Sequence, residues 1–316
     1  MPGKILCVVG PTACGKTALG IALAKKYNGE VVSADSMQIY RGMTIGTAAP
    51  TAEEMEGVPH HMIAVADPRE SWSAARYAEE ATRVIDDILS RGKLPILVGG
   101  TGLWLDAVVK GHGFAAGQAG GAVRKKLQTR LEEEGMDVLW AELRRIDPAA
   151  AQRLHPADEK RVLRALEVYY ETGKTITQHN EETKARPPRY EAIWIGLQFR
   201  DRQDMRDLID LRVDKMVEAG LLEEVRALLS SGIPADATAL QAIGYKEFLG
   251  VAAGEVTEAD AIAEVKLRSR QYAKRQLTWL RKNEAIHWIY WEKERDFARA
   301  LRLSTEILTA YGLSLG

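Results

Sequence analysis

The chain has 316 residues, with 43 basic and 44 acidic side chains and a formal net charge of −1. This length allows one large core with an inserted or appended unit, and the balanced charge excludes a uniformly basic nucleic-acid binder. Apolar runs are too short to span a membrane, and Met1–Lys4 leads directly into a predicted strand, so we expect no signal peptide. Two cysteines, Cys7 and Cys14, indicate no disulfide framework and a cytoplasmic location.

The first predicted strand, Ile5–Val9, leads into a glycine-rich loop. That loop, Gly10-Pro11-Thr12-Ala13-Cys14-Gly15-Lys16-Thr17, matches G-x-x-x-x-G-K-[ST], and a predicted helix from Ala18 follows it. Strand, loop and helix together direct backbone N–H groups and a positive helix end at one anion. Lys16 can add a charge to bound phosphates, and the Thr17 hydroxyl can ligate Mg²⁺. The motif in this context predicts a phosphate site, whether or not a nucleotide is hydrolysed there.

The second predicted strand, Glu30–Ala34, ends at Asp35-Ser36-Met37-Gln38. Ligands of open α/β sheets bind outside the carboxyl ends of the strands, so Asp35 would lie near the glycine loop if these two strands were neighbours. An aspartate at a strand end can equally cap a helix or form a turn, and the residues alone leave both roles open. Farther on, the adjacent His60 and His61 favour hydrogen bonding or stacking over a shared metal.

A third buried strand, Leu94–Val98, opens into Gly99-Gly100-Thr101-Gly102. A nucleotide hydrolase normally has an acid at the end of such a strand, where it holds magnesium and orients water. Here the strand ends in glycines, which permit a close approach of the backbone to a ligand, and in the hydroxyl of Thr101. The phosphate site is therefore not that of an ordinary nucleotide hydrolase.

A Gly/Ala-rich stretch at residues 111–121 predicts a hinge into a second unit, because the next fifty residues have a helical pattern. A further strand, Ile193–Leu197, predicts a return to the sheet. We therefore expect an α/β fold: a P-loop NTPase-like core with a parallel sheet flanked by helices, plus an inserted all-helical domain. The expected boundaries are 1–112 and 189–316 for the core and 113–188 for the insertion.

Two groups of basic residues are candidates for a nucleic-acid surface. Segment Glu264–Asn283 carries seven basic residues and one acid, with Tyr272 and Trp279 between them. Lys160, Arg161 and Arg164 form a smaller cluster on a predicted helix. Solvated basic helix faces are common, so each group has an alternative reading without RNA.

Several stretches along the chain match one family in the same order from end to end. They are Gly10–Thr17, Ser33–Tyr40, Gly46–Pro50, Pro59–His61, Gly99–Leu103, Arg164–Tyr169, Ile243–Tyr245 and Ala273–Trp279. In these stretches the sequence resembles the bacterial tRNA dimethylallyltransferases, also called tRNA isopentenyltransferases. The resemblance implies transfer of a dimethylallyl group from dimethylallyl diphosphate to the exocyclic amine of the adenosine 3′ of the anticodon.

The resemblance also implies roles for particular residues. The catalytic residues would be Asp35 as the base, Thr101 near the target amine and Lys16 on the diphosphate. The diphosphate or nucleotide site would comprise Gly10, Pro11, Thr12, Ala13, Cys14, Gly15, Lys16, Thr17 and Arg212, with Mg²⁺ on Thr17. The tRNA-binding residues would be Asp35, Ser36, Met37, Gln38, Thr101, Arg124, Lys160, Arg161, Val162, Leu163, Arg164, Gln241, Ala242, Ile243, Gly244, Tyr245, Lys246, Arg268 and Arg275.

Three positions depart from the family pattern: Cys14 replaces the usual serine, Ala49 a lysine and Trp104 a tyrosine. The helix N-terminus and Lys16 would favour the Cys14 thiolate and make it reactive, unless this thiol merely substitutes for serine. Cys7 should stay unreactive in its strand. No Cys/His zinc element follows the core, so the short bacterial form is expected.

Three rival functions remain open from the residues: an adenine-nucleotide isopentenyltransferase, a small-molecule kinase with the same loop, and a P-loop switch that binds RNA. The kinase would transfer phosphate from ATP and use Asp35 to activate a hydroxyl. For the tRNA enzyme we expect a cytoplasmic monomer whose partners are the tRNA anticodon stem-loop and dimethylallyl diphosphate, with no membrane partner.

Overall fold

The computed structural model describes residues 2–111 and 121–313. The chain divides into two compact units, one formed by Met1–Val109 with Arg189–Gly316 and the other by Lys110–Pro188. Most of the expected hinge at residues 111–121, and the expected boundary at 112/113, lie outside the described residues. The second boundary, 188/189, coincides with the division between the units.

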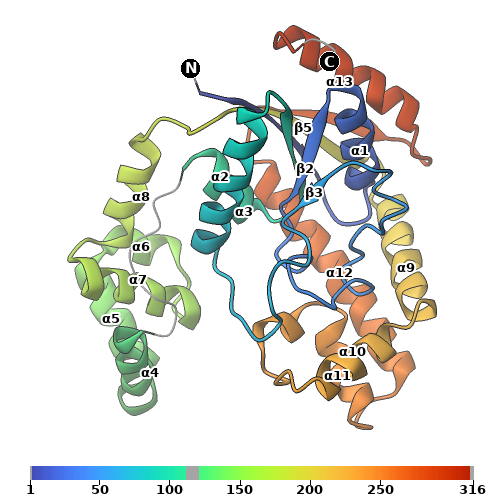
Figure 1. Ribbon diagram of the computed structural model, residues 1–316. Coiled ribbons are helices and arrows are strands. Elements are labelled where there is room, and N and C mark those ends of the chain that lie inside the picture. The colour runs from blue at the N-terminus through green and yellow to red at the C-terminus, as the bar shows by residue number, and fades with distance from the viewer. Residues whose placement is uncertain (1, 112–120, 314–316) are drawn as a thin grey trace. The chain divides into compact units, whose positions relative to one another are not determined.

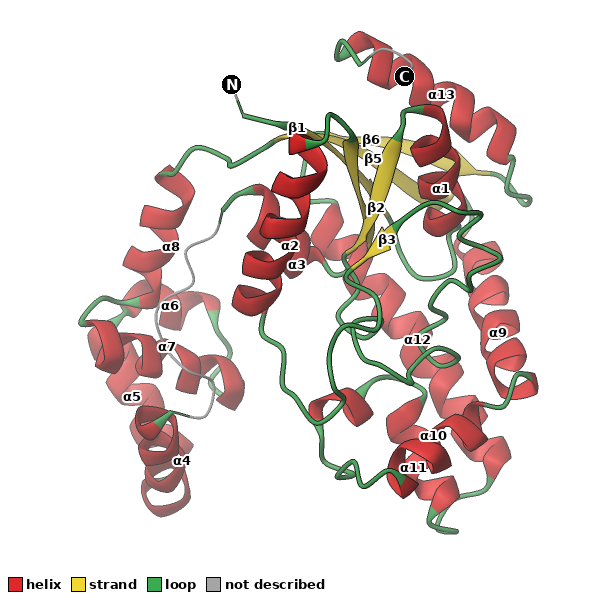
Figure 2. Cartoon of the chain, viewed as in Figure 1, coloured by secondary structure: helices red, strands yellow, loops and turns green. Residues whose placement is uncertain are grey.

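The larger unit is built on a six-stranded parallel sheet in the order β3-β2-β4-β1-β5-β6. Figure 2 shows the strands of this sheet in yellow. The strands are β1 (Lys4–Val9), β2 (Gly29–Ser33), β3 (His60–His61), β4 (Leu94–Gly99), β5 (Glu191–Phe199) and β6 (Ile286–Trp291). This confirms the expected α/β class with a parallel sheet. β4 lies between β1 and β2, however, so the two strands that were considered as possible neighbours are not adjacent.

Alternate residues of the central strands enter different cores because helices cover both faces of the sheet. In β1, Ile5, Cys7 and Val9 belong to one hydrophobic cluster, whereas Leu6 and Val8 belong to the other. A parallel sheet buried on both faces requires such continuous apolar strands, which explains why these runs were recognisable in the sequence.

Helices α2 (Ala74–Ser90) and α3 (Gly102–Val109) pack on one face, and α1 (Lys16–Lys26) and α13 (Phe297–Ala310) pack on the other (Figure 1). The other helices of this unit are α9 (Arg202–Glu218), α10 (Leu221–Ser230), the 3₁₀ turn η1 (Thr238–Gln241), α11 (Tyr245–Ala252) and α12 (Glu258–Leu280). α12 contributes Val265 to one cluster and Ala273 and Leu277 to the other, so it joins both cores.

The smaller unit is helical in its described part. It contains α4 (Ala122–Glu134), α5 (Met136–Ile146), α6 (Pro148–Arg153), α7 (Glu159–Thr172) and α8 (Ile176–Ala185). Its separate core includes Leu127, Leu139, Leu143 and Leu166. Asp147 caps α6 by accepting the Ala150 N–H at 2.9 Å and also accepts the Thr177 N–H at 3.0 Å. That buried carboxylate therefore joins α6 to α8.

β6 was absent from the sequence expectations. Its residues, Ile286–Trp291, pair in parallel with β5, and the Trp291 indole N–H donates to the Cys14 carbonyl oxygen at 2.8 Å. Its aromatic and β-branched residues, which have high strand propensity, were the signal that could have revealed it. The C-terminal strand consequently supports the glycine loop.

Glu30 is a buried acid at the start of β2, and its side chain is 3% exposed. It accepts hydrogen bonds from Arg91 Nη2 and Lys93 Nζ at 2.8 Å, and its Oε2 lies 2.8 Å from His61 Nε2. These bonds, led by that from Arg91, hold the pKa of Glu30 well below its usual range. The cluster ties β2 to the edge strand β3 and to the start of β4.

Replacing Glu30→Gln should lower the free energy of unfolding by about 2 kcal/mol at pH 7, because it leaves the surrounding cations without their carboxylate. Since the folded pKa is lowered, the carboxylate's stabilisation is complete above its unfolded pKa of about 4.3 and is lost as pH falls below it. Urea unfolding at pH 7 and pH 3 measures this.

The matched control is Glu56→Gln, which removes an exposed ion pair with Lys25 and should change stability by less than about 1 kcal/mol. Equal losses for the two variants, or a Glu30→Gln loss that does not shrink on acidification, would contradict the structural role of Glu30.

Candidate active site

The glycine loop follows β1 and opens α1, as the motif predicts. Gly10 (φ 153°) and Gly15 (φ 87°) adopt backbone conformations that favour glycine, and a Cβ on Gly10 would lie 2.4 Å from the Leu197 carbonyl oxygen. Lys16 Nζ donates to the Pro11 carbonyl oxygen at 2.7 Å, which places its ammonium group over the loop. The loop thus presents the N-terminus of α1 and one ammonium group to an anion.

Asp35 reaches the same cavity although β4 separates β1 from β2. Val9 is in register with Gly99, and Ser33 with Val98, so Asp35 extends beyond the end of β4. A Cβ on Gly99 would lie 2.3 Å from the Ala34 carbonyl oxygen. The glycines that end β4 therefore permit the chain after β2 to pass close to the centre of the sheet.

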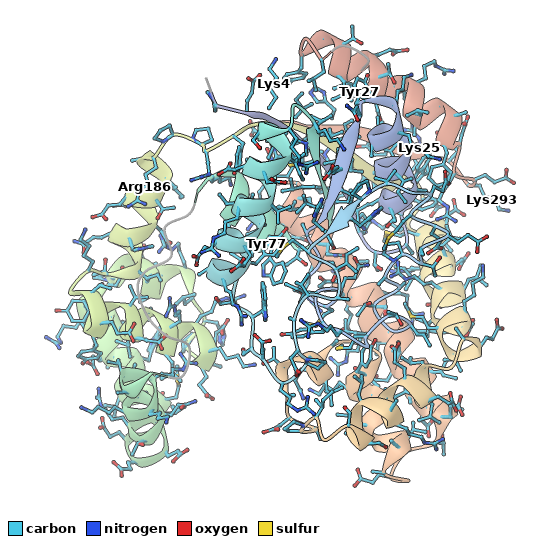
Figure 3. All side chains as sticks on the ribbon, viewed as in Figure 1. Lys4, Lys25, Tyr27, Tyr77, Arg186 and Lys293 are labelled. Atoms are coloured by element: carbon cyan, nitrogen blue, oxygen red, sulfur yellow. The ribbon has the colours of Figure 1, made fainter. Side chains whose placement is uncertain are left out.

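Tyr77 of α2, labelled in Figure 3, fixes the end of β2. Its hydroxyl donates to the Ser33 carbonyl oxygen at 2.9 Å, and its ring stacks on Trp104 with centroids 4.0 Å apart. Trp104, one of the departures from the family pattern, thus packs beneath the strand that carries Asp35. Burial raises the pKa of Tyr77, so its hydroxyl remains a donor.

Two cavities meet at Asp35. The smaller has a volume of about 70 Å³ and includes Lys16, Thr17, Ser33 and His60 in its lining. The larger has a volume of about 300 Å³ and extends toward α9, α12 and the turn before α11. Both are lined by Thr12, Asp35, Arg212 and Tyr272.

Arg212 of α9 lies at the junction of these cavities. Its Nη2 donates to the Thr47 carbonyl oxygen at 3.2 Å, and its Nε is buried without a hydrogen-bond partner in the described chain. Burial lowers the pKa of Arg212, while the nearby Asp35 carboxylate opposes this shift. A buried guanidinium with unused donors is suited to an anionic ligand.

The loop that carries Thr47 is fixed by Glu224 of α10. The Glu224 carboxylate accepts the backbone N–H groups of Thr44, Ile45 and Gly46 at 2.9–3.1 Å. It also accepts the hydroxyl of Tyr245, which is fully buried. Tyr245 was expected to bind tRNA, but its side chain instead holds this loop.

Some of the residues around and after Asp35 hold the loop in place by hydrogen bonds, and others line the larger cavity. Asp35 Oδ1 accepts the Met37 N–H at 2.9 Å, and Thr101 Oγ1 accepts the Ser36 N–H at 3.3 Å. Gln38 donates to the Ala48 carbonyl oxygen at 3.2 Å and so is already engaged. Ser36 and Met37 line the larger cavity, as do Gln241, Ala242, Ile243 and Arg275.

The expected tRNA residues of the smaller unit are in different environments. Lys160 and Arg161 are exposed, whereas Val162 and Leu163 are buried in its core, so the side chains of this last pair do not face solvent. Arg164 Nη1 lies 2.8 Å from Glu167 Oε2. Arg124 Nη1 lies 3.9 Å from the same oxygen, so one buried acid pairs with both arginines.

The adjacent histidines have separate partners, in agreement with the sequence interpretation. His60 Nδ1 lies 2.8 Å from the Val58 carbonyl oxygen, and His61 pairs with Glu30. Within residues 2–111 and 121–313, no group of three or more His, Cys, Asp or Glu side chains could hold a metal ion. No helix in those same ranges is long and apolar enough to cross a membrane.

Of the two alternatives for Cys14, a reactive thiol and a plain substitute for serine, the structure favours the second. Both cysteines are fully buried, and burial raises the pKa of the Cys14 thiol despite Lys16 Nζ at 3.9 Å from its sulfur. Burial also raises the pKa of Cys7, which agrees with the expected lack of reactivity. Desolvation outweighs the positive helix end because the Cys14 sulfur points into the core beneath Gly10.

Sequence reasoning assigned no site role to Gln276 or Tyr272 of α12. Gln276 is 5% exposed, and its Oε1 accepts the Thr12 N–H at 2.9 Å. Tyr272 is a neighbour of Thr101 and Gln276, both of which oppose the rise that burial causes in its pKa, and it lines both cavities. Both residues fall in the segment read as a basic surface, and Gln276 also belongs to the family-matching stretch Ala273–Trp279, which was the available signal.

Comparison with known proteins gives consistent results. A family model described as IPP transferase matches residues 38–283. The tRNA dimethylallyltransferase of Bacillus subtilis is 46% identical over 284 residues, 90% of either chain, and that of Acetivibrio thermocellus is 43% identical over 312 residues, 99% of either chain.

Solved structures agree with these matches. A full-length tRNA isopentenylpyrophosphate transferase from Bacillus halodurans has 41% identity and a TM-score of 0.71, with 98% of each chain covered. A eukaryotic dimethylallyltransferase described as acting on tRNA has 30% identity and a TM-score of 0.82, covering 98% of this chain and 80% of that one.

The fold and the phosphate loop define a P-loop-like transferase with a helical insertion. The chain belongs to the IPP transferase family and, within it, to the tRNA dimethylallyltransferases, enzymes that prenylate tRNA. The kinase, the free-nucleotide prenyltransferase and the RNA-binding switch are therefore set aside.

The buried thiols lead to a prediction. Iodoacetamide should alkylate Cys14 in the native protein at least about tenfold more slowly than in the unfolded chain, because the reactive thiolate is suppressed and the sulfur is inaccessible. Peptide mapping after timed labelling measures this, with Cys7 as the internal control. Rapid native labelling of Cys14 that diphosphate blocks would restore the reactive-thiol hypothesis.

Proposed function

We propose that the two cavities hold the two substrates of prenyl transfer, with the diphosphate in the smaller and the target adenine in the larger. The reaction joins the dimethylallyl carbon of dimethylallyl diphosphate to the exocyclic amine of the adenosine 3′ of the anticodon. The observation that carries this proposal is the shared wall of Thr12, Asp35, Arg212 and Tyr272. Because these four residues line both cavities, substrates bound in the two cavities would meet at Asp35.

The diphosphate leaving group gains negative charge as its bond to carbon breaks, so the site must stabilise an anion. Loop amides from Ala13 to Thr17, the Lys16 ammonium and the Arg212 guanidinium would supply this stabilisation. Lys16 would exchange its bond to the Pro11 carbonyl oxygen for the phosphate. Arg212 has a buried donor that is not engaged elsewhere in the described chain.

Magnesium fits this site only as a companion of the diphosphate. Thr17 lines the smaller cavity and would be its protein ligand, with phosphate oxygens and water completing the shell, as is usual for Mg²⁺. The bound ion would supply additional charge neutralisation on the leaving group.

Asp35 is the proposed general base. One carboxylate oxygen is held by the Met37 N–H, and the other has no hydrogen-bond partner among the described residues. That second oxygen would accept a proton from the adenine amine as the new C–N bond forms. Thr101, whose hydroxyl oxygen accepts the Ser36 N–H, would position the amine.

The structure separates the basic residues of α12 into paired and unpaired groups. Lys266, Arg268 and Arg270 lie 2.6 Å from Asp214, Glu264 and Asp210 respectively. Lys274, Arg275, Arg281 and Lys282 have no ion pair in the described chain. The cations without an ion pair therefore lie in the C-terminal half of α12 and directly after the helix.

A basic cavity of about 760 Å³ lies on the side of α12 that faces α9. Its cationic lining residues are Arg200, Arg202, Arg206, Arg270, Lys274 and Arg281, and Asp210 is the acid among them. We propose that this cavity and Arg275 contact tRNA phosphates, together with Lys160 and Arg161 of the smaller unit. The segment Gln241–Lys246 would contact tRNA through its cavity-lining and exposed residues rather than through Tyr245.

The direct test is single-turnover transfer of label from dimethylallyl diphosphate to unmodified tRNA, with labelled ATP as the alternative donor. Asp35→Asn should lower the transfer rate roughly a hundredfold or more while diphosphate binding is retained, because it removes the base and preserves the shape. Asp236→Asn, at an exposed position, is the matched control. A rate within a few-fold of the parent would assign Asp35 to structure.

The charge separation along α12 predicts unequal effects on tRNA binding. Arg275→Ala should weaken binding and reduce the salt slope by about one, because it removes one phosphate contact. Arg268→Ala should do less, since Arg268 must leave Glu264 before it can contact phosphate. Affinities measured from 50 to 200 mM salt give the slopes, with Arg302→Ala on α13 as control. A larger effect of Arg268→Ala would place the RNA surface on the opposite half of the helix.

A further inference from the structure

The phosphate loop is bonded to α12 through one buried amide side chain. Gln276 Oε1 accepts the Thr12 N–H at 2.9 Å, although the two residues are 264 positions apart in the chain. The same side chain lies against the glycines that end β4, because a Cβ on Gly100 would be 2.1 Å from Gln276 Nε2. Glycine at position 100 therefore makes room for this contact.

The neighbours of the Gln276 side chain extend from the phosphate loop toward Asp35. Tyr272 lines the same cavity as Gln276, and Gln276 opposes the rise that burial causes in the pKa of the Tyr272 hydroxyl, so the two side chains are neighbours. Thr101 acts on the same pKa in the same direction and is a second neighbour of Tyr272, and its Oγ1 accepts the Ser36 N–H at 3.3 Å. Gln276, Tyr272 and Thr101 thus lie next to one another between the phosphate loop and the residue after Asp35, with a hydrogen bond at each end of the group.

We propose that Gln276 and Tyr272 are positioning residues that set the phosphate loop relative to the acceptor side of the reaction. Gln276 holds the loop backbone at Thr12, and Tyr272 lies beside both Gln276 and Thr101, so this group of side chains would align the breaking C–O bond with the attacking amine. This inference rests on the proposed function and adds residues for which no role had been assigned.

The location of the network explains why alignment, and not binding, should depend on it. Gln276 and Tyr272 line the smaller cavity, but the charges that would bind the diphosphate belong to Lys16 and Arg212, and neither is hydrogen-bonded to Gln276 among the described residues. Thr12, which Gln276 holds, precedes the loop amides from Ala13 to Thr17 that would bind the diphosphate. A displacement of the order of 1 Å between reactants can slow a reaction about a hundredfold, while affinity for each reactant alone changes little. The expected signature is a loss in the transfer rate at nearly constant donor affinity.

The test compares Gln276→Met, Tyr272→Phe and the double variant in the full chain. Met preserves volume and Phe preserves the ring, so each change removes only hydrogen bonds. Donor binding is measured by calorimetry with dimethylallyl diphosphate, which also counts competent sites, and transfer is measured at saturating donor and tRNA. Gln128→Met and Tyr311→Phe, at exposed positions, control for the substitutions themselves.

We expect donor dissociation constants within about threefold of the parent and transfer rates per competent site lowered about tenfold or more in each single variant. The double variant should be no slower than the slower single, because both changes break the same connection. Gly100→Ala, whose Cβ would lie 2.1 Å from Gln276 Nε2 and 3.0 Å from the Gly10 carbonyl oxygen, should lower the transfer rate as Gln276→Met does.

Parent-like rates, additive losses in the double variant, or losses carried by donor affinity would each overturn the proposal. A variant that merely unfolds shows a reduced number of competent sites, which the calorimetric stoichiometry reports and the rate per site excludes. Failure of the parent to prenylate tRNA would instead count against the proposed function, so the two failures are distinguishable.

Discussion

The site depends on the absence of side chains at the end of one central strand. β4 lies between the strand that carries the phosphate loop and the strand that leads to Asp35, and any side chain on Gly99 or Gly100 would keep their loops apart. Gly100 also leaves space for Gln276, which bonds the phosphate loop at Thr12. The strand order places β4 between the base and the phosphate loop. Because Gly99 and Gly100 have no side chains, the two loops can still approach each other across the end of β4.

The acids of the chain determine which of its many cations remain available. The first half of α12 has its basic side chains matched by Asp210, Asp214 and Glu264, and Glu167 similarly engages Arg124 and Arg164 in the smaller unit. A count of basic residues therefore overstates the anion-binding surface. With 43 basic and 44 acidic side chains in the chain, the accessible positive potential is local.

Local sequence patterns were enough to predict the strands β1, β2, β4 and β5, the phosphate loop and the position of Asp35 at the end of a strand. They could not supply sheet order, which is why β1 and β2 were considered as neighbours, and β6 was missed. Burial of Cys14 and Tyr245 depends on packing by segments far along the chain. The contact between Gln276 and Thr12 is likewise long-range and leaves no trace in local periodicity, whereas the glycines of β4 were recognisable as a place of close approach.

The Glu224 carboxylate occupies a loop of converging backbone N–H groups, which is the same kind of cradle that the glycine loop offers to diphosphate. The N–H groups of residues 44–46 bind the protein's own Glu224 carboxylate, whereas those of the glycine loop would bind the substrate diphosphate. The entropy of ordering residues 44–48 is thereby lost during folding and not during catalysis. The carbonyl of Thr47 that holds Arg212 is thus in place before any donor arrives, so donor affinity need not offset the ordering of that loop.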